Sequence, residues 1–244
     1  MPTDPPDLMI RPAGHADLQA IAEVYLEARQ AAVPAMPPPV HTVEEIRAHI
    51  GGWDLTAKQV WLAEVAADVV GFAALSADWL DDLYLRPEYA GQGIGSAILD
   101  LVKAQRPAGF SLWVFESNEP ARRFYRRHGL IELDHTDGHD NEEHAPDVRM
   151  AWPGHDPLGF MRAQIDDVDT DLAHVLARRF ALTAAIQPLK PISGHAGRDP
   201  AREREIALRM AHLTGLPVEG LQQIVHAVIV ESLTAYEAGH VRNT

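Results

Sequence analysis

The segment AGQGIGSA, residues Ala90 to Ala97, has three glycines in five positions and lies between two apolar runs. It follows an expected strand and opens an expected helix, so its free backbone amides and the helix dipole would point toward an anion. Glycine suits this place because no Cβ holds a phosphate oxygen away from the backbone and because such turns use positive φ. Ile98 occupies the third small position of the dinucleotide-binding fingerprint, and the Gly-Lys-Ser/Thr of a P-loop is missing. The segment predicts a cradle for another phosphate-bearing ligand, with a tight turn that binds nothing as the alternative.

A second motif block, NEPARRFYRRHGL, begins at Asn118, some twenty residues after this segment. In order and spacing, over about residues 8–152, this block and LYLRPEYAGQGIGSAIL resemble the acetyl-CoA-binding core of the GNAT N-acetyltransferases. The resemblance implies that amides of the glycine segment bind the pyrophosphate of acetyl-CoA, the co-substrate. Gly93 and Gly95 match the family's glycines, and Ala90 stands where arginine or glutamine is usual. The implied coenzyme-binding residues are Leu83, Leu85, Gln92, Gly93, Ile94, Gly95, Ser96, Asn118 and Tyr125.

The second block carries the implied chemistry. Asn118, Ala121, Tyr125 and Gly129 match the family's Asn-x-x-Ala-x-x-x-Tyr-x-x-x-Gly. In that pattern the asparagine contacts the pantetheine arm and the tyrosine protonates the departing thiolate, a role that suits a phenol because it is neutral at pH 7. A half-buried helix tyrosine without a catalytic role is the alternative. The block also contains four arginines that would either hold coenzyme phosphates or form a solvated face: Arg122, Arg123, Arg126 and Arg127.

The acceptor of the acetyl group is expected to be a small amine. An amine attacks only when neutral, so a carboxylate, acting directly or through water, is the usual base. Asp81, Asp82 and Glu116 lie at strand positions that could face the acyl carbon, and the sequence does not choose among them. The stretch at residues 135–150 has an acidic balance that suits a cationic amine. Its three histidines could ligate a metal, but glycine and asparagine interrupt any regular face, so we predict a surface hairpin and no metal: His135, His139 and His144.

Cationic side chains of the C-terminal part fall at spacings that suggest an anion site. Arg179 and Lys190 are eleven residues apart and would share one face if a single helix persists. Arg162 lies seventeen residues before Arg179, roughly 25 Å along such a helix, so these two could share a site only between two chains. Over about residues 157–238 this arrangement, with the stretches MRAQIDDVDTDLAHVLARRFAL, RDPARERE and ESLTAY, resembles the all-helical chorismate mutases.

That resemblance implies a helix-swapped homodimer in which Arg162 reaches into the partner's site. It places Arg179 on a substrate carboxylate and Lys190 on the ether oxygen of chorismate. The rearrangement of this dianion to prephenate needs a compact conformer and stabilised charge, which arginine forks and a lysine supply. Further implied catalytic residues are Asp199, Arg202 and Glu203, of which the acidic members meet the C4 hydroxyl, and the carboxylate-binding Ser232.

Two residues depart from the mutase pattern. Tyr236 stands where the family has a glutamine or glutamate aimed at the ether oxygen, and Glu237 is one position further on. Pro188 removes an amide two residues before Lys190 and is expected to kink the first helix there. Isochorismate and 4-amino-4-deoxychorismate therefore stand beside chorismate as expected substrates.

The elements that must position these residues form two domains. Residues 8–152 mix predicted strands and helices into an α+β domain with a mostly antiparallel sheet. A capping box at Thr42 to Glu45 opens one of its helices. Residues 153–156 form a linker, and residues 157–244 form an all-α domain whose helices are expected at 158–186, 199–212 and 217–238. Residues 1–7 are expected to be a disordered tail.

Composition narrows the function. The chain has 244 residues, 46% of them hydrophobic, and a formal charge of −14 that argues against a nucleic-acid partner. The lack of cysteine excludes disulfides and thiolate metal sites, and without an apolar run of membrane-spanning length or a signal peptide we expect a cytoplasmic protein. The sequence thus predicts a bifunctional N-acetyltransferase and chorismate mutase. The alternative is an N-acetyltransferase whose helical domain only dimerises it or binds an aromatic-pathway metabolite as a regulator.

Overall fold

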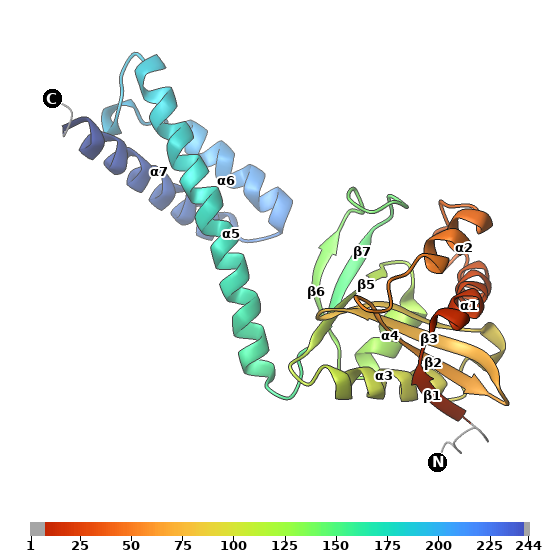
Figure 1. The fold of residues 1–244 in the computed structure, drawn as a ribbon. Helices are drawn as coiled ribbons and strands as arrows, with labels where there is room; N and C mark the ends of the chain where they lie inside the picture. The colour runs from red at the N-terminus through yellow and green to blue at the C-terminus, as the bar shows by residue number, and fades with distance from the viewer. Residues whose placement is uncertain (1–7, 242–244) are drawn as a thin grey trace. The chain divides into compact units, whose positions relative to one another are not determined.

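The chain divides into two compact units, Met1–Arg162 and Ala163–Thr244, and the computed structural model describes residues 8–241 (Figure 1). The boundary between the units falls inside a helix, beyond the linker predicted at residues 153–156. The tail predicted at residues 1–7 lies outside the described residues.

The first unit is built on one seven-stranded sheet. In order across the sheet, the strands are β1 (Leu8–Pro12), β2 (Gln59–Val65), β3 (Asp68–Ser76), β4 (Trp79–Leu85), β5 (Phe110–Phe115), β7 (Asp147–Trp152) and β6 (Ile131–Thr136). Neighbouring strands are antiparallel except β4 and β5, which run parallel. The predicted α+β domain with a mostly antiparallel sheet is confirmed.

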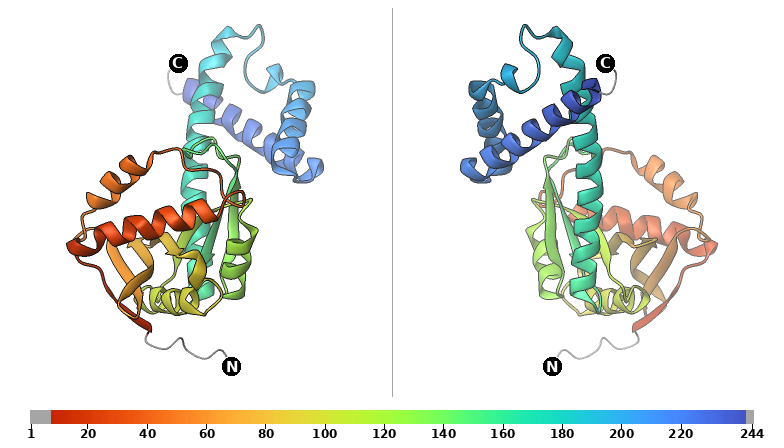
Figure 2. Two further views of the ribbon diagram at one scale, coloured as in Figure 1. Left: turned by 90° about the vertical axis from the view of Figure 1, so that its right-hand side faces the viewer. Right: turned by 90° about the vertical axis from the view of Figure 1, so that its left-hand side faces the viewer.

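Two helices pack on each face of this sheet (Figure 2). Helices α1 (Leu18–Ala31) and α2 (Val43–Gly51) cover one face, and α3 (Ile94–Gln105) and α4 (Glu119–Arg127) cover the other. The central strand β3 is buried on both faces, since Phe72 packs toward α1 and Leu75 toward α3, which explains its nearly continuous apolar sequence. The predicted capping box is present at the start of α2.

The second unit is helical. Helices α6 (Pro200–Thr214) and α7 (Val218–Val241) pack through Ala207, Leu221 and Val225. Helix α5 (Pro157–Ile186) enters this unit from the first one, and none of its residues is buried. The predicted all-helical C-terminal part is confirmed. In the part of the chain that the structure describes, no helix is long and apolar enough to cross a membrane.

Pro188 ends the first long helix instead of kinking it. Helix α5 stops at Ile186, and a short 3₁₀ turn, Gln187–Leu189, follows. Lys190 then has extended backbone angles, φ −90° and ψ 143°. Because the helix ends at Ile186, the condition under which Lys190 and Arg179 would share a helix face is not met.

Candidate active sites

The parallel pair of strands opens a cavity in the sheet. β4 and β5 are in register only at Trp79 and Ser111, near the start of each strand, and they part beyond this point. A cavity of about 560 Å³, called cavity A below, lies at the opening and reaches the hairpin loop between β6 and β7. From β4, β5 and α4 it is lined by Leu80, Asp81, Leu83, Tyr84, Leu112, Trp113, Val114, Phe115, Asn118, Ala121 and Tyr125.

The glycine segment forms the turn into α3. Gly93 caps this helix with a φ of 87°, a left-handed conformation that favours glycine. No side chain caps this end of α3, so its first amides remain available to a ligand. Gly95 also has a packing role, since an added Cβ would lie 3.2 Å from the Cδ1 atom of Leu85. Its small size lets α3 pack closely on β4.

The side chains of the other implied coenzyme contacts are mostly engaged elsewhere. Gln92 donates its amide to the carbonyl of Glu88 at 2.7 Å, and the Ser96 hydroxyl lies 3.0 Å from Nε2 of His128. Ile94 is fully buried, and Leu85 packs in the same core. Leu83 does line cavity A. The segment can therefore meet an anion chiefly through its backbone.

Asn118 and Tyr125 come together in cavity A, as their spacing on one helix predicts. Asn118 caps α4 by accepting a hydrogen bond from the amide of Ala121 at 3.3 Å. Tyr125 is 8% exposed, and burial, helped by the nearby Asp82 carboxylate, raises the pKa of its phenol. Tyr125 therefore keeps its proton over the whole physiological range and can donate it.

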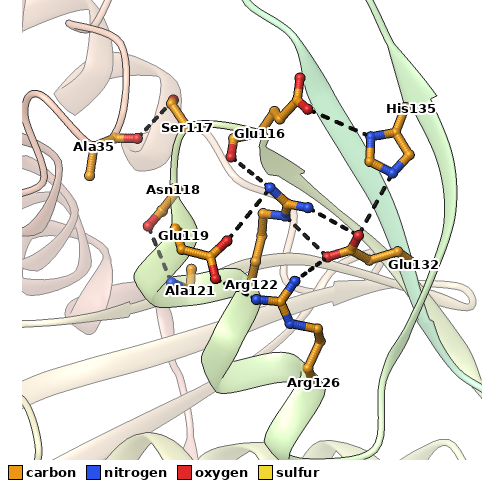
Figure 3. A network of polar contacts seen from close by, with 10 residues as sticks. All are labelled: Ala35, Glu116, Ser117, Asn118, Glu119, Ala121, Arg122, Arg126, Glu132 and His135. Carbon is orange, nitrogen blue, oxygen red and sulfur yellow. Dashed lines mark hydrogen bonds and ion pairs between the residues drawn. The ribbon is translucent and has the colours of Figure 1, made fainter.

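Two of the four arginines of α4, Arg122 and Arg126, are held by carboxylates (Figure 3). Arg122 forms a fork with Glu132, at 3.1 and 3.0 Å, and donates to the carbonyl of Glu116. Arg126 pairs with the same Glu132 at 3.0 Å and with Glu119. For Arg122 and Arg126, these pairs favour the solvated-face interpretation over phosphate binding.

The structure separates the three carboxylates that the sequence could not rank. A bulge pairs Ala74 with Asp82 and Leu75 with Leu80, which leaves Asp81 without a partner in the ladder. Asp81 accepts from Lys58 at 2.7 Å and from Ser76 at 2.5 Å.

Glu116 is half exposed and lies 3.9 Å from His135. Asp82 faces the side of the sheet that α1 and α2 cover, and burial raises its pKa to about 6. Of the three, Asp82 is the half-buried carboxylate to which none of the described residues donates a hydrogen bond.

Sequence reasoning missed a buried ion pair beside this site. Arg29, at the end of α1 and 2% exposed, donates to Glu143 of the β6–β7 loop at 2.7 Å. His41, in the α1–α2 connection, lies 2.8 Å from Glu142 of the same loop. These contacts tie two loops together near cavity A. No signal in the sequence links positions so far apart.

The three histidines of the hairpin do not converge. His135 lies near Glu116 and Glu132, while His139 pairs with Asp140 on the exposed tip. Across residues 8–241, no group of three histidine, aspartate or glutamate side chains could hold a metal ion.

The residues matched to chorismate mutase are only partly brought together. Arg162 is exposed on α5, and Arg179 donates to the hydroxyl of Thr183 one turn along the same helix, at 2.7 Å. Lys190 donates to the carbonyl of Gly197 at 3.3 Å, in the connection between α5 and α6. Lys190 thus lies next to the start of α6.

At that start, Asp199 caps α6 by accepting from two amides, at 3.0 and 3.1 Å. Arg202 is half exposed and pairs with Glu205 at 2.6 Å. Glu203 is half-buried and is held by the fork of Arg198, at 2.9 and 2.6 Å, which lowers the pKa of its carboxyl. Arg198 was not expected here.

On α7, Ser232 is buried and donates to the carbonyl of Ile229 within its own helix, at 2.9 Å. Tyr236 is partly buried. Glu237 accepts from the amide of His195 at 2.9 Å and lies 2.9 Å from its Nδ1 atom. It therefore anchors the connection between α5 and α6 and is not a free substitute for the usual glutamate.

Comparisons with known proteins agree with both resemblances. Residues 56–130 match the model of the GNAT acetyltransferase domain, and residues 161–237 match the model of chorismate mutase type II. The peptidyl-lysine N-acetyltransferase YiaC of Escherichia coli (strain K12) is 27% identical over 146 residues, which cover 59% of this chain and 97% of that protein.

Two solved structures show the same fold. The apo form of YjaB from Escherichia coli has a TM-score of 0.51 and 22% identity, covering 60% of this chain and 98% of that one. RimL, an α-N-protein acetyltransferase solved in complex with coenzyme A, has a TM-score of 0.50 and 17% identity, covering 63% and 97%. The chain therefore carries a GNAT acetyltransferase domain followed by a chorismate mutase type II domain.

Proposed function

We propose that the first unit transfers the acetyl group of acetyl-CoA to a small amine. The observation that carries this proposal is cavity A, where Tyr125 and Asn118 meet at the opening between β4 and β5. The uncapped start of α3 offers amides to the coenzyme pyrophosphate.

The neutral amine attacks the thioester carbon, the carbon–sulfur bond breaks, and the thiolate takes the proton of Tyr125. The proton that the amine loses passes to a base or to water in the cavity. Burial keeps Tyr125 protonated until the thiolate leaves.

Calorimetry with acetyl-CoA and a thiol-release assay with an amine panel test this function. We expect binding by the wild type and by Tyr125→Phe, with kcat of the variant reduced about 10²-fold or more because the proton donor is lost. No binding of acetyl-CoA by the wild type would end the proposal.

We propose that the second unit is a chorismate mutase, or a close relative acting on isochorismate or 4-amino-4-deoxychorismate, within a helix-swapped homodimer. Both activities are proposed as cytoplasmic. An exposed apolar row on α5 supports the dimer, with members 49–63% exposed: Ile165, Val168, Leu172, Val175, Leu182 and Ile186. Their spacing of three and four residues is that of a coiled-coil seam. Arg179 occupies one position of the same row.

Chorismate loss followed by absorbance tests this unit, with Arg179→Ala as the variant. Loss of a fork to a substrate carboxylate is expected to lower kcat/KM at least about 100-fold. Equal rates for both proteins would refute mutase catalysis.

One contact favours the alternative, a helical unit that binds an aromatic-pathway metabolite or only dimerises the transferase. Arg198 already occupies both oxygens of Glu203, the carboxylate implied for the C4 hydroxyl. Under this alternative, chorismate binds with a measurable Kd, or does not bind, but is not consumed.

A further inference from the structure

A second cavity, of about 540 Å³ and called cavity B below, lies on the face of the sheet that carries α1 and α2. Its walls include Tyr25, Glu45, Trp53, Lys58, Asp82 and Glu142. Cavity B adjoins cavity A at β4, because Asp82 lines cavity B while Asp81, Leu83 and Tyr84 line cavity A. One short strand segment thus faces two cavities.

Asp82 is the carboxylate of cavity B that is left without a partner. The Glu45 carboxylate accepts a hydrogen bond from the backbone amide of Thr42. The Glu142 carboxylate lies 2.8 Å from the Nε2 atom of His41. The Lys58 ammonium donates to Asp81 at 2.7 Å. Among the residues that the structure describes, none donates a hydrogen bond to Asp82, which is half-buried and is reached by the charge of Lys58 only through space. A half-buried carboxylate that faces a cavity and receives no hydrogen bond favours a cationic ligand.

The aromatic walls of cavity B suit the same kind of ligand. The Lys58 ammonium already lies 4.9 Å from the ring centroid of Trp53, so this wall accepts a cation. Tyr25 packs edge-on against Tyr84, with ring centroids 4.9 Å apart, and lines cavity B together with Trp53 and Asp82. An ammonium at Asp82 would therefore lie among aromatic rings.

The reacting amine cannot be that ammonium. It must reach the acyl carbon in cavity A, beside Tyr125, and it loses its positive charge when it is acetylated. Asp82 lies near enough to Tyr125 to act on its phenol electrostatically. Because Tyr84 of cavity A packs against Tyr25 of cavity B, a ligand with one nitrogen beside Tyr125 can place a second one beside Asp82 through a short chain.

We propose that cavity B is a cation subsite that binds the non-reacting ammonium of a diamine acceptor, with Asp82 as its counter-ion. The proposal rests on the acetyl transfer proposed for cavity A and names the class of its acceptor. The second ammonium of a diamine keeps its charge while the first nitrogen is acetylated, so it can pair with Asp82 throughout the reaction. A monoamine has no second ammonium and lacks this binding energy.

The test compares the diamines of propane, butane and pentane with propylamine, butylamine and pentylamine, using the full-length protein and Asp82→Asn. We expect a lower KM for the best diamine than for the matched monoamine. Asp82→Asn should raise that KM about tenfold or more, as loss of a charge-assisted contact does, with kcat within about threefold and the monoamine KM unchanged. Asp68→Asn, an exposed carboxylate at the start of β3, is the matched control.

A fall in kcat for both amines at constant KM would make Asp82 a base and overturn the subsite. Equal KM values for diamine and monoamine would overturn it as well. Titration of the protein with the butane diamine in a calorimeter, without acetyl-CoA, tests the cation subsite separately from acetyl transfer. Diamine binding that Asp82→Asn abolishes supports the subsite even if no acetyl transfer occurs, whereas transfer to monoamines without diamine binding refutes the subsite alone.

Discussion

Asp82→Asn is predicted to stabilise the first unit at neutral and alkaline pH. Burial raises the pKa of Asp82 from 3.8 to about 6, so folding favours the protonated carboxyl. The stability from this group is complete below pH 3.8 and is lost as pH rises through about 6. A shift of roughly two pKa units corresponds to about 3 kcal/mol at pH 8, and asparagine, which cannot ionise, avoids this cost.

Urea unfolding followed by tryptophan fluorescence measures the effect. All five tryptophans lie in the first unit, so the signal does not report the helical unit. With m of about 2 kcal/mol per molar for a unit of this size, the midpoint at pH 8 should rise by about 1–2 M, and the gain should shrink toward pH 4. Asp68→Asn, exposed at the start of β3, should show no such trend.

Equal midpoint shifts at pH 8 and pH 5, or a loss of stability at pH 8, would refute the reasoning. Either result would mean that Asp82 is already compensated in the folded protein. The unpaired carboxylate on which the cation subsite depends would then not exist.

Three further substitutions test other parts of the structure. Gly93→Ala should cost about 1–2 kcal/mol through its positive φ and weaken acetyl-CoA binding in calorimetry, whereas Gly51→Ala, with open space and a helical backbone, should do neither. Arg29→Met should lower the free energy of unfolding by about 3 kcal/mol in the fluorescence assay, because Glu143 loses its buried partner; an unchanged midpoint would contradict this. Leu172→Glu should convert the proposed dimer to a monomer in sedimentation, and Ala177→Glu, off the apolar row, should leave the proposed dimer intact; a dimeric Leu172→Glu would argue against the α5 seam.

Much of the transferase site could be predicted because its signals are local. The capping box at Thr42 and the eight-residue stretch from Asn118 to Tyr125 fix their side chains within one helix end or one helix face. The turn at Gly93 needs its glycine for backbone reasons that the sequence shows directly.

The choice between Asp81 and Asp82 could not be predicted in the same way. Simple alternation would put Leu80 and Asp82 on one face of β4. The bulge beside Asp81 moves Leu80 into the core with Leu83 and leaves Asp82 with α1 and α2. Such a bulge depends on pairing with β3, which the local sequence does not encode. The Arg29–Glu143 pair could not be predicted for a related reason, since it depends on tertiary packing.

The helical unit raises a different difficulty, because its matched residues do not all meet within one chain. Arg179 lies in the apolar row of α5, where a second helix would withdraw it from water. A guanidinium in such a seam destabilises the assembly unless an anion meets it. A dimer built only for stability would therefore favour another leucine at this position. An arginine in the seam is explained when a ligand carboxylate binds there, so the dimer and the anion site are most simply understood as one feature.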